Sequence, residues 1–149
     1  MSENLTDRTF VVFSTPAYEA GDVYDETFRA HARAVLEPLR EQLMAAGRSA
    51  STVDDHSHYG VAFSVDDGVG GRVYVLLQYV DPWLLTLTRQ LRLRDRLRRA
   101  KEDEVDAALV NAVDAALKAV GVSSVRWFTE GEYNRAASGP GPVDTDPPS

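Results

Sequence analysis

The sequence contains no cysteine, so disulfide bonds and thiolate catalysis are both excluded. A chain without cysteine suits a reducing compartment, and we expect a cytoplasmic protein. Lysine is nearly missing as well, because 14 of the 16 basic residues are arginine. Since arginine codons are rich in G and C, we interpret this bias as the mark of a GC-rich, bacterial genome, which concerns origin rather than function.

Targeting and membrane-spanning segments are also missing. Residues 1–8 lack the basic start and apolar stretch of a signal peptide. No uninterrupted apolar run approaches the roughly 20 residues that cross a bilayer. We therefore expect a soluble protein that makes no membrane contact.

Familiar patterns of catalysis are not found. There is no Gly-x-Ser-x-Gly elbow for a serine nucleophile. The segment Gly68 to Gly71 is rich in glycine, but a phosphate-binding loop needs a helix after it, and here a second strand is predicted. Ser57 lies between two histidines, but neighbouring residues of a strand point to opposite faces, so neither histidine can readily activate it. We therefore expect a non-enzymatic protein without a cofactor.

What the sequence does contain is typical of one globular domain, with 44% hydrophobic and 26% charged residues in a chain of 149. Its central feature is a predicted hairpin over residues 59–80. The first arm alternates, and one of its faces is formed by Tyr59, Val61, Phe63 and Val65. The second arm, residues 73–80, is apolar on both faces except at Gln78, which predicts a strand covered on both sides. Glycines in residues 67–71 supply the positive φ angles that a reversal needs.

A strand and a helix are predicted before this hairpin. Residues 9–14 are apolar, aromatic and β-branched, which favours a strand. An apolar stripe at helical spacing then predicts a helix that begins near Asp22 or Asp25 and ends at Gly47. Pro38 lies inside it, so we expect a kink there or two abutting helices.

Further elements flank the hairpin or follow it. We interpret residues 50–58 as an extension of the hairpin's first arm, with Gly60 as a bulge between the two parts. Alanines and branched residues at helical spacing make residues 102–120 the clearest helix, which Gly121 ends. Residues 122–129 alternate again and predict the last strand.

Residues 84–94 fit a strand better than a helix. On a strand, one face would be formed by Leu85, Leu87, Leu91 and Leu93. The other face would be formed by Thr86, Thr88, Gln90, Arg92 and Arg94. We expect the preceding Asp81-Pro82 pair to form a bulge or corner at a sheet edge.

The predicted order of elements is β-α-β-β-(β)-α-β, which belongs to the α+β class. This order fits an antiparallel sheet with two helices packed on one face, a ferredoxin-like (split βαβ) variant with an extended central hairpin. Residues 9–133 would form the single domain after a flexible start, residues 1–8. Residues 136–149 are rich in proline and glycine and are predicted to be a disordered tail.

Asp54, His56 and His58 are candidate metal ligands. Alternate residues of a strand project from one face, so these side chains would converge on a divalent cation such as zinc. The spacing matches no strong metal motif, and an exposed polar face of an edge strand is the competing interpretation. His31 would be a distant fourth ligand, although its place beside the apolar stripe favours a boundary residue.

Basic residues are concentrated in one short segment. Seven of the 16 lie within 13 positions, namely Arg89, Arg92, Arg94, Arg96, Arg98, Arg99 and Lys101. Guanidinium groups bind carboxylates and phosphates through paired hydrogen bonds. A nucleic acid or another anion is therefore one possible ligand, with Tyr74 or Trp83 as stacking partners. The net charge of −7 opposes a long polyanion, which favours an acidic protein surface instead.

The segregated charge and the missing catalytic groups together favour a small interaction domain. We expect it to bind a protein partner, or a second copy of itself, through a sheet edge and the arginine-rich strand. The alternatives are a metal-binding protein or metal-dependent enzyme that uses Asp54, His56 and His58, and nucleic-acid or anion binding through residues 89–101.

Overall fold

The computed structural model describes residues 5–14, 26–56, 60–68, 71–79, 83–90 and 104–138. The helices within these ranges are α1 (Glu26–Ala45), α3 (Ala107–Ala119) and α4 (Glu130–Ser138). The strands are β1 (Leu5–Thr6), β2 (Arg8–Ser14), β3 (Asp54–His56), β4 (Gly60–Asp66), β5 (Arg72–Tyr79), β6 (Trp83–Gln90), β7 (Val105–Asp106) and β8 (Ser123–Thr129). The chain is an α+β protein with an antiparallel sheet and packed helices, as the sequence predicts.

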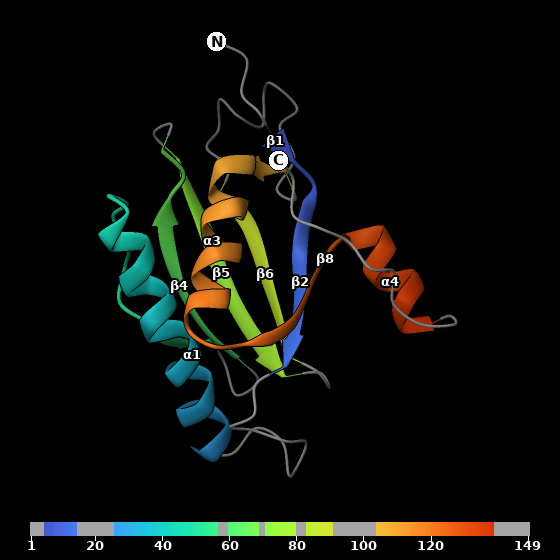
Figure 1. The fold of residues 1–149 in the computed structure, drawn as a ribbon, viewed down its shortest axis with the longest axis horizontal. Coiled ribbons are helices and arrows are strands. Elements are labelled where there is room, and N and C mark those ends of the chain that lie inside the picture. Colours follow the sequence, from blue (N-terminus) through green and yellow to red (C-terminus); the bar gives the residue numbers. More distant parts are fainter. Residues whose placement is uncertain are drawn as a thin grey trace.

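The main sheet has six strands in the order β3-β4-β5-β6-β2-β8, and every neighbouring pair is antiparallel. Helices α1 and α3 cover one face of it, which we call the helix face (Figure 1). Strands β6 and β8 run parallel with β2 between them, so β6, α3 and β8 form a split βαβ unit. The other crossover spans more of the sheet, because α1 connects β2 to β3 at the far edge. From there the chain crosses the sheet through β4 and β5 to β6, which pairs with β2.

The main core lies between the two helices and the helix face. The largest side chains that are fully buried include Trp83, Trp127, Phe13 and Phe63. On β5, side chains on this face are fully buried, whereas Tyr74, Leu76 and Gln78 on the other face are only half-buried. The prediction that the second hairpin arm is covered on both sides is therefore wrong for this part of β5.

Glycine ends both helices of this layer, as predicted. Gly47 has φ +96°, its N–H donates to the carbonyl of Met44 at 3.0 Å, and the next N–H donates to that of Leu43 at 3.1 Å. Gly121 has φ +90° and ends α3 with the same pair of bonds. Only glycine adopts such φ angles without strain. Helix α1 runs through Pro38 as one element, so the prediction of two abutting helices is wrong.

Residues 54–56 do not extend the hairpin's first arm. They form β3, which folds back and pairs antiparallel with β4, so that His56 lies opposite Gly60. A Cβ at Gly60 would lie 3.0 Å from the Leu77 carbonyl oxygen, so glycine here permits a close approach between strands. The predicted bulge at Gly60 is therefore wrong, and the whole of β4 gains an outer neighbour.

The described part of the arginine-rich segment is extended, as predicted, but it does not lie at an edge. Strand β6 is an interior strand between β5 and β2. Leu85 and Leu87 are buried on the helix face, as expected. Residues 80–82 and 91–103 lie outside the described residues, so the predicted corner at Asp81-Pro82 does as well. Helix α3 begins at Ala107, later than predicted, because residues 105–106 form β7.

The ends of the described chain contain structure that the sequence did not predict. Residues 5–6 form β1 and pair with β7 in a second, two-stranded sheet. Helix α4 follows β8 directly and continues to Ser138, past the predicted domain boundary near residue 136. Within the described ranges, no helix has the length and apolar character needed to cross a bilayer.

Candidate functional site

Two of the three candidate metal ligands share a face of the sheet. Strand β3 places Asp54 and His56 on the face opposite α1 and α3, whereas His58 lies outside the described residues. Nδ1 of His56 is hydrogen-bonded to the hydroxyl of Tyr74 at 2.7 Å, and the two rings meet edge-on. Within the described ranges, no group of three or more His, Asp or Glu side chains is arranged to hold a metal. His31, on α1, is half-buried.

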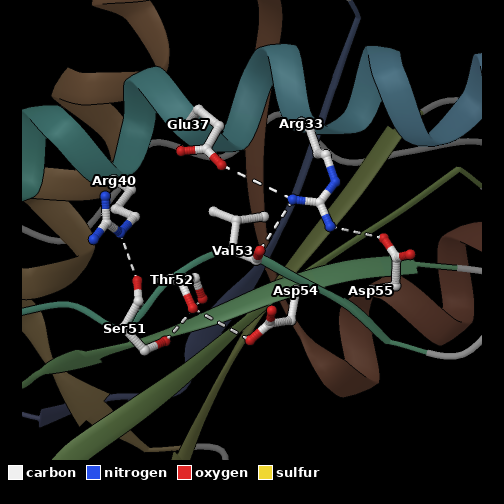
Figure 2. Close-up of polar contacts among 8 residues, drawn as sticks. All are labelled: Arg33, Glu37, Arg40, Ser51, Thr52, Val53, Asp54 and Asp55. Atoms are coloured by element: carbon white, nitrogen blue, oxygen red, sulfur yellow. Dashed lines mark hydrogen bonds and ion pairs between the residues drawn. The ribbon is translucent and has the colours of Figure 1, made fainter.

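Asp55, between these two residues, points the other way and binds arginines of α1. Nη2 of Arg33 donates to Oδ1 of Asp55 at 3.0 Å, and Nε of Arg29 lies 3.8 Å from Oδ2 (Figure 2 shows the Arg33 contact). These arginines are four residues apart on α1 and so project from one side of the helix. Sequence reasoning missed this contact, although the spacing of Arg29, Arg33 and Glu37 was visible.

A bulge interrupts the edge just before β3. Residues 49–51 pair with residues 64–66, and residues 54–56 pair with residues 60–62. The register therefore changes by one residue, and Thr52 and Val53 form the bulge. The hydroxyl of Ser51 accepts the Ser64 N–H at 2.9 Å, in the place that the Ser51 carbonyl would take in a regular ladder.

The carbonyl groups that the bulge turns away from β4 are bound by α1. Nε of Arg40 donates to the Ser51 carbonyl, and Nη1 of Arg33 donates to the Val53 carbonyl at 3.0 Å (Figure 2). Thr52 and Asp54 are exposed, and their side chains are 3.5 Å apart. This edge of the sheet is thus bulged, charged and bonded to a helix, three features that discourage another strand from pairing there.

Asp66, the last residue of β4, binds the segment that follows α1. Its carboxylate accepts hydrogen bonds from the backbone N–H groups of Ser49 and Gly68, and from the Ser49 hydroxyl. These bonds, chiefly that from the Ser49 backbone, and the Arg48 guanidinium hold the pKa of Asp66 below its usual value. The hairpin turn and the segment after α1 are therefore joined through one carboxylate.

The described structure contains little of the arginine cluster. Arg89 lies opposite Val73 on the helix face of β6 and is half-buried. Thr88 and Gln90 point to the other face, as predicted. The remaining candidates, Arg92, Arg94, Arg96, Arg98 and Arg99, lie outside the described residues.

The opposite edge of the sheet is β8, and it is built differently. Within the described chain, β8 pairs with β2 alone. Its first residues, Ser123 and Ser124, are exposed, and Ser124 has a positive φ of 57°. Trp127 anchors the strand, because its indole Nε1 donates to the buried Asp114 carboxylate of α3 at 3.0 Å. A strand with one paired side presents a row of backbone donors and acceptors on its other side.

Helix α4 lies beside this edge. Thr129 and Glu132 form a capping box, in which the Thr129 N–H donates to Oε1 of Glu132 at 2.9 Å and the Glu132 N–H donates to Oγ1 of Thr129 at 3.1 Å. These bonds lower the pKa of Glu132, with help from Arg8, whose Nη2 lies 3.8 Å from Oε2. Burial raises the pKa of Tyr133, whose ring lies 5.4 Å from that of Phe10. The Thr-x-x-Glu signal was readable in the sequence and was missed.

The chain matches no protein-family model, and comparison with curated proteins and with solved structures finds no match. The site is therefore argued from its geometry alone.

Proposed function

We propose that the chain is a small interaction domain that binds a protein partner, or a second copy of itself, through the β8 edge of its sheet. The observation that carries this proposal is the difference between the two edges. The β3 edge is three residues long, bulged and bonded to arginines of α1, whereas β8 is seven residues long and pairs with β2 from Ser123 to Thr129, with one register from Arg126 to Phe128 and a shift on either side.

Strand addition supplies both affinity and specificity to such an edge. The backbone groups of the added strand bond to those of β8, and its alternate side chains contact the two faces beside the edge. On the helix face this neighbour is α3, through Asp114 and Lys118, whose side chains are 2.9 Å apart. On the opposite face the neighbours are Arg126 and α4. A basic side chain therefore flanks the edge on each face, Lys118 on one and Arg126 on the other, which suits a reversible complex.

The arginine-rich segment suits an acidic surface on that partner. It begins at Arg89, at the end of β6, and contains seven of the 16 basic residues. A net charge of −7 makes a long nucleic acid a poor ligand for the whole molecule. An acidic protein segment meets less repulsion, and its binding weakens as salt rises.

Light scattering after size exclusion, combined with pulldown from a cell extract, tests the proposal. Ser123→Lys places a charge at an exposed position of the β8 edge, and Thr52→Lys places the same charge at an exposed position of the closed β3 edge as a matched control. We expect Ser123→Lys to reduce self-association or partner retention at least several-fold and Thr52→Lys to leave it unchanged. A folded chain that is monomeric at every concentration and salt, and that retains no protein, contradicts the proposal. Equal effects of the two lysines would contradict the choice of edge.

A second proposal is cation binding by Asp54, His56 and His58. It is favoured by one observation, namely that Asp54 and His56 share a face of β3. Elemental analysis of protein purified without a histidine tag tests it, together with melting in added zinc. We expect zinc to raise the melting temperature of the wild type but not of a His56→Ala/His58→Ala variant. Unchanged melting of the wild type, with no metal found, would remove this proposal.

A further inference from the structure

Two hydrogen bonds at the end of β8 define the direction of its backbone groups. The N–H of Thr129 donates to Oε1 of Glu132 at 2.9 Å. Arg8 faces Thr129 across the ladder, and its N–H donates to Oγ1 of Thr6 at 3.1 Å. Because both N–H groups bond outside the ladder, Arg8 and Thr129 form a non-hydrogen-bonded pair. The Thr129 N–H therefore points away from β2.

This direction determines which other groups of β8 point away from β2. The strand keeps one register with β2 from Arg126 to Phe128, and backbone groups along a strand point alternately to its two sides. The N–H and C=O of Trp127 and the C=O of Val125 consequently point away from β2. We call these backbone groups of Val125 and Trp127 the outward row.

The outward row is short, because each of its ends is limited. At one end, the Thr129 N–H is already bonded to Glu132. At the other end, Ser124 has a φ of 57° and lies within the register shift between β8 and β2. Bulged backbone interrupts regular pairing. An added antiparallel strand would therefore pair with Val125 and Trp127 through a segment of about three residues.

Two copies of β8 fit each other poorly along this row. In a symmetric pair centred on Arg126, the two Arg126 side chains lie directly opposite each other, and like charges in that position are destabilising. In a pair centred on Trp127, the C=O of Val125 faces the Thr129 N–H of the other copy, which Glu132 already accepts. A segment with a different sequence meets neither obstacle.

We propose that the partner at the β8 edge is a short extended segment of another protein, with an acidic residue opposite Arg126. This inference rests on the proposed function and names the partner that it leaves open. Arg126 lies on the face opposite the helix face, and its neighbour on β2 is the apolar Val12. On the added strand, the residue opposite Arg126 takes the closer, non-hydrogen-bonded position. A carboxylate there gives the guanidinium a cross-strand neighbour of opposite charge, whereas a basic residue meets like charge.

An NMR titration of the isotope-labelled chain tests this assignment with two blocked peptides, Thr-Val-Glu-Val-Thr and Thr-Val-Lys-Val-Thr. We expect the Glu peptide to bind several-fold more tightly than the Lys peptide. It should shift the amide of Trp127 more than those of Arg126 and Phe128, whose N–H groups point to β2. Arg126→Glu should reverse the preference, and Arg126→Gln should remove it. Arg135→Glu, at an exposed position of α4, is the matched control and should keep the wild-type preference.

The outcomes separate this inference from the proposed function. A preference for the Glu peptide that persists in folded Arg126→Gln overturns the role of Arg126. Equal binding of both peptides, with shifts at Trp127, overturns the acidic residue and leaves strand addition at β8 in place. If neither peptide shifts Trp127, the short segment is overturned, and pulldown with Ser123→Lys decides whether the proposed function also fails. A dimer that Ser123→Lys disrupts would identify a second copy as the occupant and likewise overturn this inference.

Discussion

The indole N–H of Trp127 donates a 3.0 Å hydrogen bond to Oδ1 of Asp114, which joins the edge strand β8 to helix α3 inside the core. Trp127 is fully buried and Asp114 nearly so, at 7% exposed. The other carboxylate oxygen lies 2.9 Å from Nζ of Lys118, which is exposed. One buried acid therefore satisfies an indole and brings a surface cation to the rim of the core.

We expect Asp114→Ala to lower the free energy of unfolding by about 1–3 kcal/mol, because it leaves the buried indole N–H without an acceptor. Asp114→Asn keeps the acceptor oxygen and should lose less. Lys118→Ala removes only an exposed ion pair and should change stability by less than about 1 kcal/mol. Urea unfolding of the three variants measures these differences. Equal losses in the alanine and asparagine variants would show that the hydrogen bond is unimportant.

Thr9 should tolerate the loss of its hydroxyl. The side chain is fully buried, and its Oγ1 has no hydrogen-bond partner among the described residues. Burying an unbonded hydroxyl is unfavourable, so Thr9→Val, which keeps the shape, should raise the free energy of unfolding by roughly 1 kcal/mol. Thermal melting measures the change, with Thr88→Val at a half-buried position as the control. A lower melting temperature in Thr9→Val would reveal a hydrogen bond that the described residues do not contain.

Acid should weaken the contact between the β4–β5 turn and the segment after α1. The pKa of Asp66 in the folded chain is below its value in the unfolded chain, so its contribution is complete above the unfolded value and lost as the pH falls through the folded one. We expect Asp66→Asn to flatten the fall in stability between about pH 5 and pH 2. Chemical unfolding at several pH values measures this slope. Identical slopes in wild type and Asp66→Asn would contradict the role given to Asp66.

Ser51→Ala should weaken the β3 edge. It removes the hydroxyl that accepts the Ser64 N–H, and the Ser51 carbonyl is already bound by Arg40. We expect a loss of about 1–2 kcal/mol and faster amide exchange at Ser64. Thr52→Ala, at the neighbouring exposed position of the bulge, serves as the control. Unchanged exchange at Ser64 in Ser51→Ala would mean that the carbonyl can return to the ladder.

Local patterns predicted most of the described fold. Alternation identified β4 and β8, and helical spacing identified α1 and α3, since burial of one face is written directly into the order of residues. Gly47 and Gly121 marked helix ends because their φ angles exclude most other residues. Helix α4 was missed because it follows a strand without a loop, and its capping box was hidden at the strand's last residue.

The site was less predictable, because it depends on pairing between distant segments. No periodicity distinguishes a strand that continues past Gly60 from one that turns back on β4, since both bury the same side chains. The contact between Arg33 and Asp55 joins residues that are 22 positions apart and follows from that choice. Residue spacing did place Asp54 and His56 on one face, but it could not reveal that Tyr74 lies beside His56.

The closed β3 edge has a consequence for how far assembly can proceed. A molecule that can pair through both edges of its sheet adds one copy after another and forms a filament. A molecule that can pair through one edge alone forms only a pair. Because arginines of α1 occupy the backbone oxygens at the bulge, self-association through the proposed β8 edge should stop at a pair.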